Sequence, residues 1–163
     1  AIRLVGEHLE RAVHSPENTQ ARDAMAYAAM LAGMAFSNSG VGLVHALEYP
    51  IGAITHCSHG EGNGLLLPFV MEFNMPECQG TLAKVASLLT GKPESSCRPE
   101  DAIESTRLLQ SRIGIRNRLS ELGLRAEHIP AVANKAIQIE RLMSITARRP
   151  SESDLVNLLA KAL

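Results

Sequence analysis

An excess of charge of one sign, paired cysteines and long apolar runs are all missing from this sequence. Its 163 residues carry 16 Lys and Arg against 17 Asp and Glu, so the formal net charge is -1. A chain without a basic excess has no strong electrostatic attraction for nucleic acid or for an anionic membrane. We therefore expect neither as a partner.

The cysteine content argues against sulfur-based sites. The three cysteines are an odd number and show no C-x-x-C spacing, which indicates neither a disulfide framework nor a thiolate zinc site. No apolar run approaches the roughly 18 residues that cross a bilayer, and the opening segment "AIRLVGEHLERAVHS" is amphipathic rather than signal-like. These absences favour a cytoplasmic protein in a reducing compartment.

Several common catalytic motifs are missing as well. The chain contains no G-x-S-x-G, no P-loop and no H-E-x-x-H. The glycine-rich stretches "GEGNG" and "SGVGLV" follow no predicted strand, so they fail the structural context that a dinucleotide-binding loop requires. We expect these glycines to serve tight turns and close helix packing.

Alternation of period two is absent, whereas helical periodicity recurs along the chain. "AIRLVGEHLERAV" follows a 3.6-residue rhythm, and Ser15-Pro16-Glu17 predicts the start of an alanine-rich helix that we expect to be buried. "LLLPFVMEFN" fits a buried strand or a helix, and without alternation elsewhere we predict the helix. Residues 1–163 are thus predicted to form one all-α domain of roughly eight helices.

Three histidines lie close together in the apolar segment "GLVHALEYPIGAITHCSHGEGNGLLLPFVMEFN". His45 has apolar neighbours, and His59 begins a glycine-rich stretch after a turn, so the two imidazoles can converge on Zn or Fe(II). A single buried histidine is more often a satisfied core residue. The nearest carboxylates, Glu48 and Glu61, lie at awkward spacings for sharing one ion with both histidines, so the residues alone leave the site underdetermined.

The same segment carries a family pattern. "GMAFSNSGVGLVHALEYPIG" followed by "SHGEGNGLLLPFVMEFN" resembles the C-terminal helical domain of the iron-containing (group III) alcohol dehydrogenases, a multihelical domain of the dehydroquinate synthase-like type. The resemblance implies that His45 and His59 are metal ligands and that Phe36 lines the substrate pocket. Tyr49 stands where many members have a proton-relaying histidine, and His56 is either a pocket-wall residue or an exposed one.

Part of the family pattern is not found in the chain. The other two metal ligands of the family come from a D-x-x-x-H helix, which does not occur here, and the α/β nucleotide-binding domain is absent. Ala1 also begins within an apparent helix, without Met and without an N-cap. Residues 1–163 are therefore expected to be a fragment, a metal-binding domain whose native chain extends upstream.

The resemblance implies a metal-dependent, NAD- or NADP-linked oxidoreductase. Such an enzyme uses Fe(II) or Zn(II) and interconverts a small-molecule alcohol with its aldehyde, or a hydroxy acid with its carbonyl compound, by hydride transfer. The family also implies a homo-oligomer. Two alternatives stay open: a hydroxyacid-oxoacid transhydrogenase on the same scaffold, and a non-catalytic helical fragment whose histidines are structural.

Overall fold

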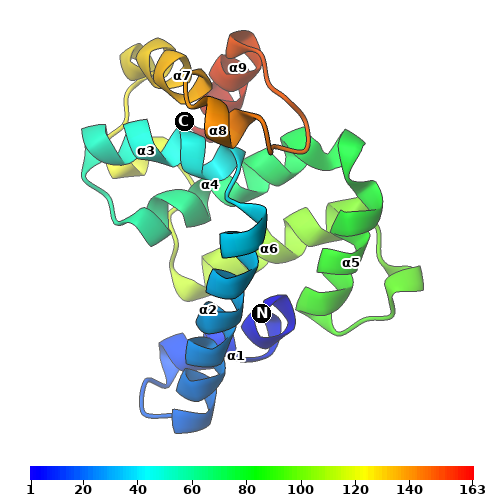
Figure 1. Cartoon of the computed structure of the whole chain (residues 1–163). Coiled ribbons are helices and arrows are strands. Elements are labelled where there is room, and N and C mark those ends of the chain that lie inside the picture. Colours follow the sequence, from blue (N-terminus) through cyan, green and yellow to red (C-terminus); the bar gives the residue numbers. More distant parts are fainter. The chain divides into compact units, whose positions relative to one another are not determined.

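A computed structural model describes residues 1–163, and it consists of helices joined by turns, with no strand (Figure 1). The all-α prediction is confirmed, and the ambiguous "LLLPFVMEFN" segment lies within a helix. The chain divides into two compact units. Unit 1 comprises Ala1–Gly40 and Cys78–Gly114, and unit 2 comprises Val41–Glu77 and Ile115–Leu163.

Unit 1 is built from four α-helices and one short 3-10 turn. The second helix begins later than the Ser15-Pro16-Glu17 stretch predicts, because Asn18 provides its N-cap. The side chain of Asn18 accepts a hydrogen bond from the Ala21 N–H at 2.9 Å. The elements are α1 (Ile2–His14), α2 (Thr19–Ser39), α5 (Gln79–Thr90), η2 (Glu94–Ser96) and α6 (Pro99–Ile113).

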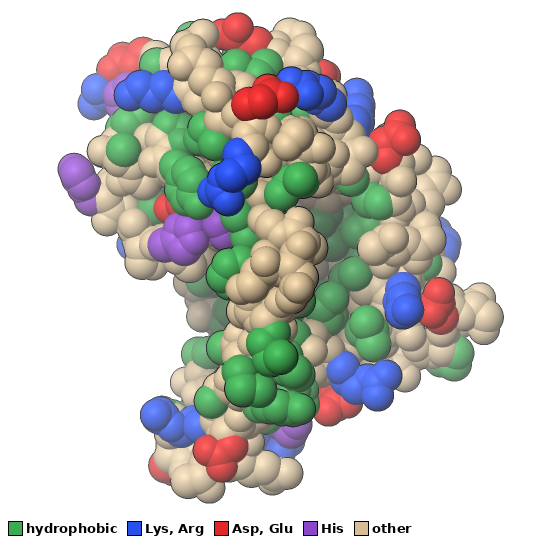
Figure 2. Space-filling view, viewed as in Figure 1, with side chains coloured by type: hydrophobic (Ala, Val, Ile, Leu, Met, Phe, Trp, Pro, Cys, Tyr) green, Lys and Arg blue, Asp and Glu red, His purple; other side chains and the backbone are tan.

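The alanine-rich helix α2 is more exposed than its composition predicts. Only Ala21 and Ala28 of this helix are buried, and Figure 2 shows apolar side chains gathered on its surface. Met30 and Met34 are each exposed by half or more. The expectation of a buried helix was therefore wrong for this unit, because α1 is the main helix that packs against α2.

None of the helices is by itself long and apolar enough to cross a membrane. Only α2 and α3 (Leu43–Thr55), taken together across the break between them, have the required length and composition.

The contact between α1 and α5 depends on a glycine. A Cβ atom added at Gly6 would collide with the carbonyl oxygen of Leu89 and would lie 2.9 Å from its carbonyl carbon and its Cα. These are backbone atoms, so they cannot move aside as the end of a side chain could. Gly6 therefore sets how closely the backbones of the two helices approach.

We predict that Gly6→Ala lowers the free energy of unfolding. Overpacking costs about 1–3 kcal/mol, and this outweighs the gain of up to about 1 kcal/mol that alanine brings to a helix interior. Gly80→Ala is the matched control, because an added Cβ at Gly80 meets nothing within 4 Å. Urea unfolding of both variants checks this, and equal stability of the two would contradict it.

In unit 2, helix α3 packs against most of the other helices. α3 packs against α4 (His59–Asn74) and against α7 (Ile129–Ile137) and α8 (Glu140–Met143), while α7 also packs against α9 (Glu152–Ala162) (Figure 1). Short 3-10 turns complete the unit: η1 (Met75–Glu77), η3 (Leu119–Leu122) and η4 (Ala126–His128).

The core of unit 2 is aliphatic, and α3 supplies much of it. Leu43, Leu47 and Ile51 follow one another at four-residue intervals and are each at most 2% exposed, as expected for one buried stripe of a helix. They meet Leu65 and Leu66 of α4 in the same cluster. The buried stripe fixes the rotation of α3 about its axis, and hence the direction of its polar side chains.

Candidate metal centre

His45 lies in the first turn of α3, on a helix start that another part of unit 2 completes. The N-cap residue Gly42 has no side chain to accept a hydrogen bond. Instead, the hydroxyl of Thr146 accepts one from the Leu43 N–H at 3.2 Å. This contact ties the start of α3 to the segment between α8 and α9, and His45, which is half-buried, follows two residues later.

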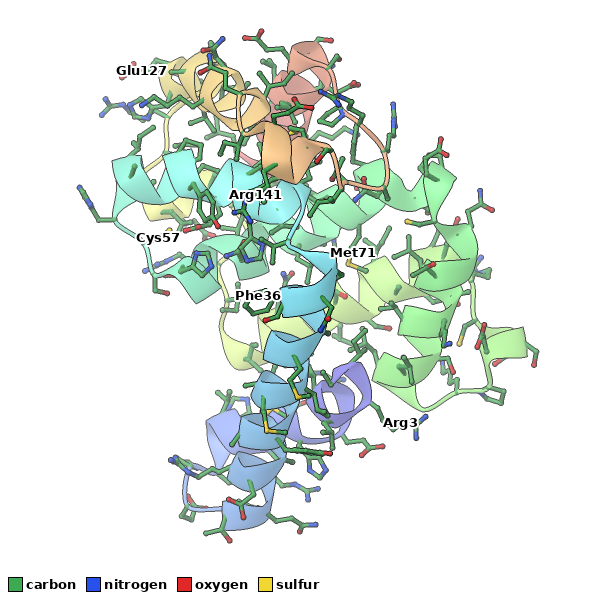
Figure 3. The ribbon with its side chains drawn as sticks, in the orientation of Figure 1. Arg3, Phe36, Cys57, Met71, Glu127 and Arg141 are labelled. Atoms are coloured by element: carbon green, nitrogen blue, oxygen red, sulfur yellow. The ribbon has the colours of Figure 1, made fainter.

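His59 is the first residue of α4, just after a tight reversal of the chain. His56 ends α3 in the left-handed conformation with φ 56°, a geometry that ends helices. Cys57, labelled in Figure 3, lies in the short connection. Ser58 then caps α4 by accepting a hydrogen bond from the Glu61 N–H at 3.3 Å. The reversal brings His59 back toward the first turn of α3.

The two predicted ligands and Tyr49 form one cluster of rings. The ring centroids of His45 and His59 are 5.2 Å apart. Tyr49 follows His45 by one helical turn, and its centroid is 6.3 Å from that of His45 and 6.2 Å from that of His59. Figure 2 shows histidine side chains gathered on the surface of unit 2.

Glu48 contacts His59 directly, which the sequence spacing did not predict. Its Oε2 atom lies 2.7 Å from Nδ1 of His59, although Glu48 is only 4% exposed. The other candidate carboxylate, Glu61, instead forms an ion pair with Arg116 at 2.6 Å. Glu48 therefore contacts the Nδ1 side of the His59 ring, so the other nitrogen, Nε2, points away from the carboxylate.

Asn63 lies against the ring of His59 from one turn further along α4. Its Nδ2 atom donates a hydrogen bond to the backbone oxygen of His59 at 2.9 Å and lies 3.2 Å from Nδ1 and 3.0 Å from Nε2. A partner on the lone-pair axis of Nε2 would be far from Nδ1. The similar distances thus place the amide beside the ring, off the lone-pair axis of Nε2.

The surroundings of His45 favour its neutral form. Burial lowers the pKa of His45, and so does the proximity of His59, while the nearby carboxylate of Glu48 acts in the opposite direction. Metal ions bind imidazole in its neutral form. The environment therefore suits a nitrogen donor more than a cation.

The two histidines have a suitable spacing for one divalent ion. Two imidazoles that bind an ion at about 2.0–2.1 Å with tetrahedral angles have ring centroids roughly 5 Å apart, close to the separation of His45 and His59. No group of three or more His, Cys, Asp or Glu side chains in the chain could hold a metal ion. These residues therefore fit part of a coordination shell, with further positions left for other ligands.

Two predicted site residues remain, His56 and Phe36. His56 is exposed, and no side-chain hydrogen bond or ring contact involves its imidazole. Phe36 lies on α2 in unit 1 and is 52% exposed (Figure 3). Its predicted role in the substrate pocket, like the ligand roles of His45 and His59, stays a prediction.

Comparison with known proteins identifies the family. The model described as Fe-containing alcohol dehydrogenase family, C-terminal, matches residues 1–163. The chain belongs to the iron-containing alcohol dehydrogenase family. The resemblance seen in the sequence is confirmed, and the helices are those of the C-terminal helical domain of these dehydrogenases.

Individual relatives of this dehydrogenase domain are enzymes of greater length. The probable alcohol dehydrogenase EutG of Salmonella typhimurium is 35% identical over 99% of this chain and 40% of its own length. The 1,3-propanediol dehydrogenase of Citrobacter freundii is 33% identical over 99% of this chain and 42% of its own length. The chain thus spans about two fifths of the curated relatives that it matches.

Solved structures agree with this assignment to the dehydrogenase family. The crystal structure of a 1,3-propanediol oxidoreductase matches with a TM-score of 0.94 at 32% identity, covering 99% of this chain and 43% of that one. An alcohol dehydrogenase from Oenococcus oeni matches with a TM-score of 0.92 at 30% identity, covering 99% and 43%.

We predict that Thr146→Val destabilises the dehydrogenase domain by roughly 0.5–2 kcal/mol, the usual cost of losing an N-cap acceptor. Valine keeps the shape of threonine but removes the oxygen that accepts from the Leu43 N–H. Thr81→Val, at an exposed position of α5, is the control. Chemical unfolding measures both variants, and a Thr146→Val protein as stable as the control would refute the capping role.

Proposed function

We propose that residues 1–163 are the metal-binding part of a metal-dependent, NAD(P)-linked alcohol dehydrogenase that interconverts an alcohol or hydroxy acid with its carbonyl compound. One observation carries the proposal: in a chain of this family, His45 and His59 come together at a separation that suits one ion. The proposed ligands follow from this, one nitrogen from each imidazole.

The proposed roles of the side chains follow from their contacts. His45 and His59 bind the ion, and when bound it supplies a Lewis acid that polarises the oxygen of the substrate. Glu48 accepts a hydrogen bond from Nδ1 of His59, so Nε2 is the nitrogen that binds the ion. Asn63 rests beside the same ring. Hydride transfer itself belongs to the nicotinamide, which the protein orients.

Tyr49 is the proposed catalytic residue of the cluster. It is 42% exposed, and its ring is stacked on His59 with an interplanar angle of 23°. Its phenol can both donate and accept a hydrogen bond. We propose that it passes or orients a proton near the ion, where many family members have a histidine.

The finer features of the proposal rest on the family. They are Fe(II) or Zn(II) as the ion, NAD or NADP as the hydride carrier, a homo-oligomeric assembly and a cytoplasmic location. One relative is named as a probable alcohol dehydrogenase and another as a 1,3-propanediol dehydrogenase, and these names support small alcohols and aldehydes as substrates. Phe36 and His56 are the proposed substrate-pocket residues.

The first test is metal content and turnover in the full-length protein. We expect His45→Ala and His59→Ala each to lower metal affinity and alcohol oxidation by orders of magnitude, because each removes a donor atom. His14→Ala is the control, since this exposed histidine hydrogen-bonds the backbone oxygen of Arg112 in unit 1. Metal content that matches wild type in either of the first two variants would disprove its ligand role.

Tyr49→Phe separates proton handling from metal binding. We expect the variant to keep its metal, because Tyr49 is not a ligand, and to lose roughly 10²–10⁴-fold in turnover if the phenol moves the proton. The control is Tyr27→Phe, at an exposed position of α2. Wild-type turnover across the pH range would show that the phenol has no such role.

The same assay distinguishes the two alternatives. A hydroxyacid-oxoacid transhydrogenase turns over without added NAD or NADP, whereas a dehydrogenase requires one of them. A non-catalytic fragment contains no metal in either condition.

A further inference from the structure

The buried carboxylate of Glu48 lies next to His59, in a space left by two glycines, Gly52 and Gly62. The side chain of Glu48 is 5% exposed, whereas that of His59 is 58% exposed. A Cβ atom added at Gly52 of α3 would lie 2.8 Å from Oε1 of Glu48. One added at Gly62 of α4 would lie 2.8 Å from its Cγ and 3.2 Å from Sγ of Cys57. Larger residues at either position would displace the carboxylate.

Burial of this acid is costly for the fold unless the acid has a partner. A polar or charged group removed from water loses its hydration, and an apolar residue of similar volume would normally pack there at least as well. The side chain of Glu48 has one hydrogen-bond partner in the structure, Nδ1 of His59. The space made by Gly52 and Gly62 thus serves a contact with His59.

We propose that Glu48 is a positioning residue that holds His59 in the tautomer with its proton on Nδ1, so that the lone pair of Nε2 is presented to the metal. This inference rests on the function proposed above. A neutral imidazole carries its proton on either nitrogen, and the hydrogen bond at one nitrogen decides which one is free. Glu48 binds no metal in this role.

The geometry distinguishes this role from that of a third ligand. The 2.7 Å contact joins the carboxylate to Nδ1, and the buried position of Glu48 places it on the side of the ring that solvent does not reach. The open side of His59 therefore lies away from the carboxylate. Metal-bound histidines commonly donate their second N–H to such a carboxylate, and loss of that partner lowers metal affinity about 10–100-fold.

The test replaces Glu48 in the full-length protein and measures two quantities. Co²⁺ titration followed by its absorption spectrum gives metal affinity, and ¹⁵N NMR of the metal-free protein reports the tautomer of His59. We expect Glu48→Leu, which keeps the volume but removes the acceptor, to weaken Co²⁺ binding about 10–100-fold and to lose the Nδ1–H tautomer. Glu48→Gln keeps an acceptor oxygen and should restore most of both properties.

The matched control for the charge is Glu61→Gln. It makes the same chemical change in the same unit, but the carboxylate that it removes pairs with Arg116. We expect its Co²⁺ affinity and its His59 tautomer to equal those of wild type.

A second route moves the carboxylate without removing it. Gly62→Ala introduces a methyl group against Cγ of Glu48, whereas Gly60→Ala, two residues earlier in the same helix, meets nothing within 4 Å. We expect Gly62→Ala to weaken Co²⁺ binding and Gly60→Ala to leave it unchanged. This pair tests the proposal even if Glu48→Leu does not fold.

The outcomes separate the two levels of the proposal. If wild-type protein binds no Co²⁺, the proposed function fails and the role of Glu48 toward a metal fails with it. If wild type binds Co²⁺ and Glu48→Leu and Gly62→Ala match it in affinity and tautomer, only the positioning role is overturned. Weaker binding in both variants, with recovery in Glu48→Gln, supports the inference.

Discussion

Helix α3 buries Leu43, Leu47 and Ile51 in the core of unit 2, and this burial determines where its other side chains point. Successive residues of a helix are turned by about 100°. Residues two positions after each buried leucine, His45 and Tyr49, therefore face away from the core. The aliphatic stripe thus directs both rings toward the surface, although it contributes no atom to the chemistry.

The same rotation accounts for the position of Glu48. This residue follows Leu47 directly, at the border between the buried and the exposed faces, and Gly52 lies one turn further along that border. The border meets α4, and the reversal at His56 returns His59 to it. The carboxylate is therefore held between two helices, which limits its freedom more than a surface position would.

Sequence reasoning reached the helices and the histidines but not the contacts between them. Helical periodicity and the family motif are local signals, so they identified the helical class and singled out His45 and His59. The Glu48 contact joins residues 11 positions apart across a chain reversal, and no helical spacing encodes such a pair. Likewise, the exposure of α2 depends on which helices cover it, a tertiary property that its alanines do not reveal.

Two glycines, Gly52 and Gly62, have a packing role that differs from that of glycines in a nucleotide-binding loop. Gly52 and Gly62 lie in two different helices, and neither has a positive φ, so neither is required by backbone conformation. Glycine in a helix costs about 1 kcal/mol relative to alanine, and both positions bear this cost beside one carboxylate. The space that the Glu48 side chain needs is the physical reason for both glycines.

Because the three residues share one space, their substitutions should not be additive. Once Glu48 is replaced by alanine, a methyl group at position 62 no longer meets the Cγ atom of the glutamate. The glycines are thus coupled to the site through volume rather than through any atom that they donate.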